Sequence, residues 1–333
     1  MRTRPPAFVL LVLLACAGVL AATAGQVAPA APPSVAWRNP VVARDFPDPS
    51  VARAAGAFWA TSTASADAPG FPLLRSADLV HWTRVGSVFG RPPAWVVGSL
   101  WAPELAVGPD GVRLYYTGRR ADGRLCVGVA SAPAPQGPYA DHGPLVCQPA
   151  GSIDPSEVRD ARGRPYLVWK EDGNAVGQPS RIWIKRLRRD RLGLIGPRRE
   201  LLRNASRWEG KVVEAPEMVA RDGWIYLFYS GNAYGPPRCA YALGVARSRS
   251  IFGPWTRDPA NPILRSNAAW RCPGHAAIVE DGAGRDFALY HAYRAGGDAA
   301  GPRMAMLDAV TWSADDWPVV NAGRGPSTTM VLR

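Results

Sequence analysis

Three acidic residues, Asp48, Asp154 and Glu214, each stand just before a proline at widely separated points of the chain. Taken singly, an acidic residue before proline is a common way to begin a turn, and proline favours extended conformations in the residue before it. A cluster of three carboxylates is different, because like charges gathered at one place raise one another's pKa values and lower stability. We therefore expect these three side chains to serve chemistry.

The chemistry open to such a cluster is acid-base catalysis. The sequence has no C-x-x-C or H-x-x-x-H spacing for zinc, no phosphate-binding glycine loop and no nucleophilic serine or cysteine arrangement. A carboxyl cluster without those motifs suits glycoside hydrolysis, in which one carboxylic acid protonates the leaving oxygen and a second carboxylate activates water.

The positions of these acids follow a repeat in the sequence. Five prolines, spaced 54, 52, 61 and 57 residues apart, each begin a similar stretch: Pro49, Pro103, Pro155, Pro216 and Pro273. After each proline, two short runs that suit strands flank a Gly or Asp-Gly turn, as in MVARDGWIYLFYS, which is the pattern of a β-hairpin. Further short strands follow each hairpin, and no segment shows a sustained helical period.

Self-similar β units of this length predict an all-β protein, a five-bladed β-propeller. A β-sandwich with a second domain is the competing architecture. In a propeller the first strand of every blade lines the central channel, so the residues before the five prolines converge on one mouth. No Pro/Gly/Ser-rich linker interrupts the chain after about residue 36, and we expect one catalytic domain over residues 37–333.

The N-terminus has the sequence pattern of an export signal. Two arginines precede an apolar run that ends in small residues, which predicts a signal peptide over residues 1–24 and a short linker over 25–36. The run is too short for a membrane span, and no other stretch is a candidate for one. The protein is therefore expected to be secreted, with a lipoprotein attached through Cys16 as the alternative.

Four cysteines follow the predicted signal peptide. An even count in an exported chain predicts two disulfides. We pair Cys126 with Cys147 and Cys239 with Cys272, because each pair flanks one repeat segment; four separate thiols are the alternative.

The chain carries a formal net charge of +12, spread as scattered arginines with one cluster, KRLRRDRLGLIGPRR. The cluster lacks interleaved aromatic residues and lies in an exported protein, so a solvated edge is favoured over a nucleic-acid site. Positive charge would also suit a polyanionic matrix such as pectin.

Several phrases, in this order and spacing, resemble glycoside hydrolase family 43, which contains arabinofuranosidases, arabinanases and β-xylosidases. They include NPVVARDFPDPSV, WAPEL, IDPSEVRDARGRPYLVW, VVEAPEMVARDGWIYLFYS and PGHAAIV, and the resemblance covers about residues 39 to 320. The family implies a five-bladed propeller, which agrees with the repeat.

The resemblance also implies roles for the three acids. Asp48 matches the general base, Glu214 the general acid, and Asp154 the residue that tunes the pKa of the acid and orients it. Glu217 competes with Glu214, but it shares its position after proline with Glu104, whereas no other repeat has an acid that matches Glu214.

Three further residues are expected at the mouth. Trp101 could stack on a sugar ring or pack as a core tryptophan between blades. His275 matches the family's channel histidine, which holds water or a metal ion such as a structural Ca²⁺, and could instead be a structural histidine. Arg303 could contact substrate hydroxyls or brace the last blade. The chemistry itself needs no cofactor.

These observations predict an inverting, monomeric hydrolase that releases α-L-arabinofuranosyl units from arabinan or arabinose-substituted plant polysaccharide. A β-xylosidase is the first alternative, and the end of the chain soon after the fifth repeat favours arabinose, since family β-xylosidases often add a C-terminal β-sandwich. A catalytically silent, sugar-binding propeller is the alternative from another class, against which the three acids argue.

Overall fold

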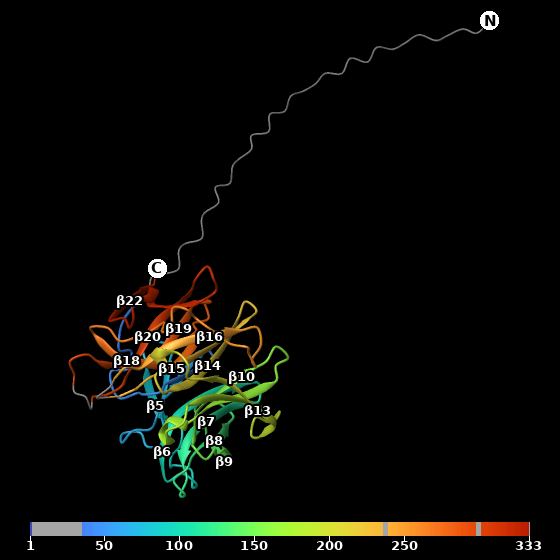
Figure 1. Cartoon of the computed structure of the whole chain (residues 1–333), viewed down its shortest axis with the longest axis vertical. Coiled ribbons are helices and arrows are strands. Elements are labelled where there is room, and N and C mark those ends of the chain that lie inside the picture. Colours follow the sequence, from blue (N-terminus) through green and yellow to red (C-terminus); the bar gives the residue numbers. More distant parts are fainter. Residues whose placement is uncertain (2–34, 236–238, 298–300, 333) are drawn as a thin grey trace.

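The computed structural model describes residue 1 and residues 35–235, 239–297 and 301–332. These residues form five four-stranded antiparallel sheets, each made of strands consecutive in the sequence, and one two-stranded sheet (Figure 1). The innermost strand of each sheet packs beside that of the next, and the last returns to the first. The predicted five-bladed β-propeller is thereby confirmed, and the sandwich alternative is wrong.

Each blade runs outward from the channel strand by strand. Blade 1 comprises β2 (Ser50–Ala54), β3 (Ala57–Thr61), β4 (Pro72–Ser76) and β5 (Thr83–Ser87). Blade 2 comprises β6 (Gly98–Gly108), β7 (Gly111–Arg119), β8 (Leu125–Ala132) and β9 (Ala140–Val146). Blade 3 comprises β10 (Ser152–Arg159), β11 (Pro165–Glu171), β12 (Arg181–Leu187) and β13 (Leu194–Arg203). Blade 4 comprises β14 (Val213–Arg221), β15 (Trp224–Gly231), β16 (Ala242–Ser248) and β17 (Thr256–Arg257). Blade 5 comprises β18 (Trp270–Glu280), β19 (Asp286–Arg294), β20 (Met304–Trp312) and β21 (Pro318–Val320). Three short 3₁₀ helices lie at Gly173–Val176, Arg207–Glu209 and Asn321–Gly323.

The core is divided among the five interfaces between blades. Because side chains alternate along a strand, β11 sends Leu167 and Trp169 toward blade 2 and Tyr166 and Val168 toward blade 4. Both faces of such a strand are buried, which explains why the second strand of each repeat reads as an unbroken apolar run. The same division recurs between blades 1 and 2, 4 and 5, and 5 and 1.

The ring is closed by segments outside the blades. β1 (Val35–Arg38) pairs with β22 (Thr329–Leu332) in a two-stranded antiparallel sheet. Asn39 continues this contact, because its side chain donates to the Leu307 carbonyl at 3.0 Å and to Ser327 Oγ at 2.8 Å, and accepts from the Leu307 amide. We call these contacts the terminal clasp. It joins the beginning of the domain to β20 of blade 5.

Both predicted disulfides are present, Cys126–Cys147 in blade 2 and Cys239–Cys272 between blades 4 and 5. The arginine cluster is only in part the solvated edge that we expected. Arg191 is buried with 1% of its side chain exposed, and it forms ion pairs with Asp110 and Glu157. A buried arginine needs such partners, so this residue ties blade 3 to blade 2.

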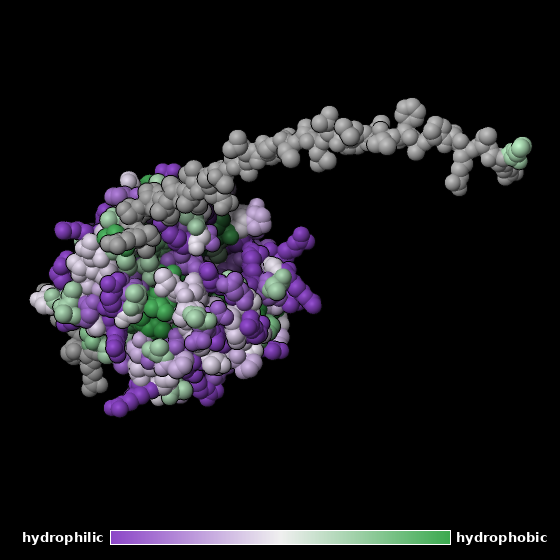
Figure 2. Space-filling model, turned by 90° about the horizontal axis from the view of Figure 1, so that it is seen from above, coloured by the Kyte–Doolittle hydropathy of each residue, from purple (hydrophilic) through white to green (hydrophobic). Residues whose placement is uncertain are grey.

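The surface in Figure 2 is largely hydrophilic, with hydrophobic residues in small patches. None of the helices among the described residues is long and apolar enough to cross a membrane. The predicted signal peptide and nearly all of the linker lie outside the described residues.

Candidate active site

The three predicted carboxylates are brought to one end of the channel by the starts of three inner strands. Asp48 lies two residues before β2, Asp154 lies in β10 and Glu214 in β14. Asp154 and Glu214 are buried, with 8% and 9% of their surfaces exposed. Carboxyl groups held this far from water respond strongly to neighbouring charges.

The proline motif shapes the backbone in the same way in every blade. The residues directly before the prolines all have φ between 41° and 53°: Asp48, Ala102, Asp154, Ala215 and Cys272. This is the left-handed region rather than the extended conformation expected before proline. In blades 2 to 5 the pairing with the second strand shifts register at this point, so the motif forms a β-bulge, a feature that redirects side chains next to active sites.

Glu214 does not occupy the same position of the motif as the two aspartates. It stands one residue earlier than the bulge residue Ala215, in the place that Trp101 occupies in blade 2. The description of all three acids as standing just before a proline therefore holds directly only for the two aspartates, because Ala215 separates Glu214 from Pro216.

Asp48 is surrounded by donors and positive charge. Thr63 Oγ1 donates to its Oδ2 at 2.6 Å, and Arg303 Nη1 donates to its Oδ1 at 3.0 Å. The Nδ1 atoms of His275 and His291 each lie 3.4 Å from the same Oδ1. The backbone amide of Asp48 donates to His291 Nδ1 at 3.1 Å, which places the proton of this neutral imidazole on Nε2.

These neighbours determine the charge of Asp48. Burial by itself raises the pKa of this carboxyl, but the charge of Arg303 and the hydrogen bond and charge of His275 outweigh burial and hold the pKa well below its ordinary value. Burial lowers the pKa of His291 well below its ordinary value, with Arg303 adding to the effect, so His291 is neutral. Asp48 is therefore ionised at neutral pH.

Glu214 is held by two buried donors. Lys170 Nζ lies 2.7 Å from its Oε2, and the Tyr241 hydroxyl donates to its Oε1 at 2.7 Å. Lys170 is 1% exposed and also lies 2.8 Å from Asp172 Oδ1, so its charge is shared between two carboxylates. Both oxygens of Glu214 are thus fixed in position.

Asp154 holds the backbone of the strand that carries Glu214. Its Oδ2 accepts a hydrogen bond from the Ala215 amide at 3.1 Å. Burial is the largest cause of a rise in the pKa of Asp154 to about 7; the Glu214 carboxylate adds to the rise, whereas His275 and Lys170 oppose it. Asp154 therefore takes up a proton near neutral pH, a range in which Asp48 does not.

A ring of polar side chains links the blades around the mouth. At four of the five blade junctions, a polar side chain near the end of one blade's second strand accepts a hydrogen bond from a backbone N–H of the next blade's inner segment. The four acceptors and their donors are Thr63 and Ala102, Thr117 and Asp154, Ser230 and His275, and His291 and Asp48. In the second strand of blade 3 the corresponding residue is Lys170, which cannot accept a hydrogen bond. Asp154 accepts the Ala215 amide there instead, and the lysine binds the Glu214 carboxylate.

The other predicted residues lie around the same mouth. Arg303 and His275 both contact Asp48. Trp101 is 36% exposed, with the Arg119 guanidinium 5.7 Å from its ring centre, so it is not a core tryptophan between blades. Its exposed ring is available to a ligand.

A structural Ca²⁺ at His275 would need several oxygen ligands around it. Among the described residues, no group of three or more His, Cys, Asp or Glu side chains is arranged to hold a metal ion. His275 faces Asp48 through Nδ1, and Asp48 is already bound by Arg303. The protein ligands at this point do not fit a dedicated Ca²⁺ site.

Glu217, the competing acid, lies deeper in the channel. It lines a cavity of about 20 Å³ together with Glu104 and Asp154. Burial raises the pKa of Glu217 well above its ordinary value, and the Glu104 charge raises it further. A carboxyl below the mouth, with room for about one water molecule beside it, has no space for a sugar.

Sequence reasoning missed four residues of the site: Thr63, Lys170, Tyr241 and His291. His291 stood in the phrase YHAY and Lys170 in LVWKED, each as the polar residue of an apolar second strand. A polar residue in a strand buried on both faces needs a partner, and that was the available signal.

Known proteins share the sequence pattern of this chain. The family model Glycosyl hydrolases family 43 matches residues 37–318. This chain belongs to glycoside hydrolase family 43. The relatives include a xylosidase/arabinosidase of Butyrivibrio fibrisolvens, 28% identical over 88% of this chain and 58% of its own length. They also include an extracellular endo-α-(1→5)-L-arabinanase of Bacillus subtilis, 25% identical over 81% of this chain and 86% of its own.

The fold agrees with the family. The crystal structure of a thermostable family-43 glycoside hydrolase superposes with a TM-score of 0.77 at 25% identity, covering 88% of this chain and 97% of that one. The chain spans a little over half the length of several curated family 43 relatives. The chain accordingly has the propeller fold of family 43 members.

Proposed function

We propose that this family 43 protein is an inverting glycoside hydrolase that releases α-L-arabinofuranosyl units from arabinan or arabinose-substituted plant polysaccharide. The observation that carries the catalytic part is the contrast between Asp48 and the pair formed by Asp154 and Glu214. Positive neighbours hold the pKa of Asp48 well below its ordinary value, whereas burial raises the pKa of Asp154, which holds the strand that carries Glu214, to about 7. Environments that shift carboxyl pKa values in opposite directions support a base on the Asp48 side of the mouth and an acid on the Glu214 side.

Asp48 is the general base in this proposal. It takes the proton from a water molecule that attacks the anomeric carbon, while Arg303 and Thr63 keep the carboxylate oriented. The low pKa of Asp48 makes it a weak base, so orientation of the water has to supply much of its effect.

Glu214 is the general acid. Its carboxyl protonates the leaving glycosidic oxygen, and Asp154 modulates the pKa of Glu214 through its own charge. Lys170 and Tyr241 fix the two oxygens, so that the acid approaches the bond from one direction. Trp101 offers a ring face to the sugar.

The choice of sugar rests on the relatives. The Bacillus subtilis relative is named for α-L-arabinan, whereas the Butyrivibrio fibrisolvens relative is named for both xylosides and arabinosides. A β-xylosidase acting on xylo-oligosaccharides is therefore the second candidate. We also propose that the enzyme acts outside the cell, which its two disulfides and the extracellular relative support. We propose in addition that it is a monomer.

Product analysis on arabinan, arabinoxylan and xylo-oligosaccharides tests the substrate, with aryl α-L-arabinofuranoside and aryl β-xyloside compared under the same conditions. Proton NMR of the first product formed tests inversion. Asp48→Asn should abolish hydrolysis of every substrate, because no other group activates the water. Retained anomeric configuration, or near-normal rates in Asp48→Asn, would overturn the mechanism; sugar binding without hydrolysis would instead identify a binding propeller.

A further inference from the structure

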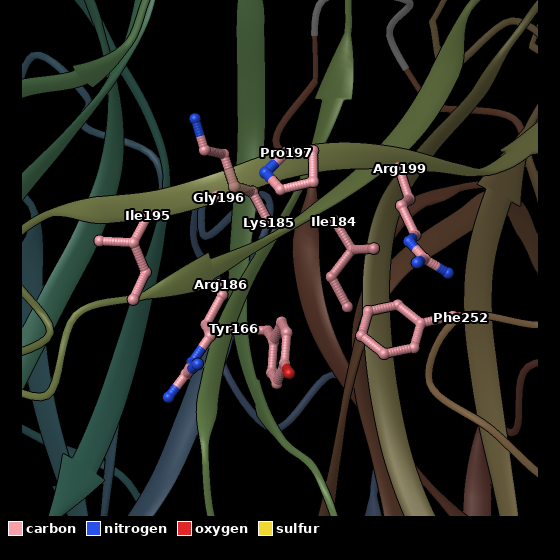
Figure 3. A pocket seen from close by; sticks show the side chains of 9 residues that line it. All are labelled: Tyr166, Ile184, Lys185, Arg186, Ile195, Gly196, Pro197, Arg199 and Phe252. Carbon is pink, nitrogen blue, oxygen red and sulfur yellow. The ribbon is translucent and has the colours of Figure 1, made fainter.

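A groove on the outer part of blade 3 lies away from the catalytic mouth. It has a volume of about 280 Å³ and lies over β11, β12 and β13, with Phe252 of blade 4 on its other side (Figure 3). Tyr166, Arg186 and Ile195 are direct neighbours across the three strands, so their side chains share one face. The groove is therefore formed by regular strand pairing rather than by loops.

The groove carries positive charge that the protein does not neutralise. Arg186 and Arg199 are exposed. Over the described part of the chain, neither of these two side chains forms an ion pair with a carboxylate, whereas nearby Arg188 and Arg203 each do. The Arg199 guanidinium stands 4.9 Å from the Phe252 ring centre, which holds it at the groove.

The lining combines these cations with apolar surface. Phe252 is partly exposed and packs edge to face against the buried Tyr166, with ring centres 5.4 Å apart, and Ile195 and Pro197 complete the apolar part. Arginine forks bind carboxylates through two parallel hydrogen bonds, and aromatic and aliphatic surfaces suit the C–H faces of sugar rings. A ligand with both features is a sugar that bears a carboxylate.

The groove is also placed where it cannot belong to the catalytic site. Asp154 stands near the start of β10, whereas Tyr166 pairs with Val158 toward the other end of that strand. Four residues of extended strand correspond to about 13 Å, and the groove lies further out across the blade. One polymer chain would have to pass along the outside of blade 3 to reach both places.

We propose that this groove is a second, non-catalytic binding site for uronic-acid-containing polysaccharide. It would hold the enzyme on the acidic component of a plant polysaccharide mixture while the mouth acts on neutral side chains. The inference goes beyond the proposed activity, because it concerns a separate site with its own ligand.

Affinity electrophoresis and calorimetry with de-esterified polygalacturonate test the proposal in the whole protein. Arg186→Gln/Arg199→Gln should weaken binding at least about tenfold, and added salt should weaken binding by the wild type. The matched control is Arg53→Gln/Arg75→Gln, which removes two exposed arginines that face Phe58 and Trp59 in blade 1. The control should bind polygalacturonate as the wild type does.

Hydrolysis of a small aryl glycoside should be unchanged in both double variants, which separates this test from that of the activity. Equal loss of binding in the groove variant and the control would show general charge attraction and overturn the proposal. Equally tight, groove-dependent binding of duplex DNA would overturn it in favour of a nucleic-acid surface, and absence of polygalacturonate binding would also refute it.

Discussion

At the scale of single residues, the site is determined by which charges stand next to which carboxyl. Asp48 meets Arg303 and two imidazoles, whereas Asp154 meets another buried carboxylate. Burial pushes the pKa of both aspartates upward, and only the neighbours differ. Two aspartates at the same end of the channel therefore have pKa values shifted in opposite directions, lowered for Asp48 and raised for Asp154.

Glu214→Gln should lose more activity on substrates whose leaving oxygen needs protonation than on substrates whose leaving oxygen does not. We expect a loss of about 10²- to 10⁴-fold on arabino-oligosaccharides and a much smaller loss on aryl glycosides, whose leaving oxygen is already a weak base. Steady-state kcat/KM on a series of aryl leaving groups measures this. An equal loss on all substrates would show that Glu214 is not the proton donor.

Asp154→Asn should change the pH dependence of both stability and activity. A carboxyl whose pKa is raised on folding contributes stability that is present below its unfolded pKa and is lost as pH rises through the folded value of about 7. Asparagine has no such loss and can still accept the Ala215 amide, so the variant should be more stable than the wild type at pH 8.

Activity should fall in the same variant, with the alkaline limb of the profile moved to lower pH, because Glu214 loses its proton more easily without an ionised neighbour. Urea unfolding at pH 5 and pH 8, together with pH–rate profiles, provides the measurement. An alkaline limb at its wild-type position would remove Asp154 from the proposed role.

Lys170→Met keeps the length of the side chain but removes the cation between Glu214 and Asp172. We expect the pH–activity profile to move to higher pH, since both carboxylates lose a stabilising charge. Breaking a buried ion pair costs about 3 to 5 kcal/mol, so the fold is monitored alongside by circular dichroism. Lys170→Met/Asp172→Asn should regain stability but keep the shifted profile; a wild-type profile in the double variant would contradict the role of Lys170.

At the scale of elements, the proline bulge places the site residues at the mouth. Five equivalent residues adopt positive φ, and two of them are alanines, whose side chains carry no functional group. Such backbone costs energy, and the polar ring around the mouth holds it in place. In blades 2 and 3 the stabilising contact is a threonine hydroxyl, Thr63 or Thr117, that accepts the amide of the bulge residue.

Thr117→Val should therefore destabilise the junction between blades 2 and 3. The substitution keeps the shape of the side chain but leaves the buried Asp154 amide without its acceptor, at a cost of about 1 to 3 kcal/mol. Thr311→Val, at an exposed position near the end of β20, is the matched control and should cost less than about 0.5 kcal/mol. Urea denaturation compares the two, and equal midpoints would show that the amide finds another partner.

At the scale of the whole molecule, the repeat predicted the ring of blades, because regular spacing in sequence becomes regular spacing around an axis. Together with the even number of cysteines after the predicted signal peptide, the repeat also predicted both cysteine pairings. It did not predict Lys170 or His291 as parts of the site. These residues act across blade junctions, and a single sequence does not show which polar side chain of one repeat meets the next. The burial of Arg191 was missed for the same reason, because its partner Asp110 lies in the preceding repeat.

The terminal clasp has a consequence for how the enzyme fails on heating. The clasp secures the seam between blades 1 and 5, and Asp48 on one side of that seam is held by His275, His291 and Arg303 on the other. Asn39→Ala removes clasp hydrogen bonds without touching the site, so gentle heating should inactivate this variant several degrees before its circular dichroism signal melts. Asn261→Ala, which loses comparable bonds within blade 4, should lose activity and structure together. If each variant loses activity and its circular dichroism signal at the same temperature, the seam opens no earlier than the blades. If Asn39→Ala alone loses activity at a lower temperature than it loses the signal, the seam that holds Asp48 is the first part of the molecule to open on heating.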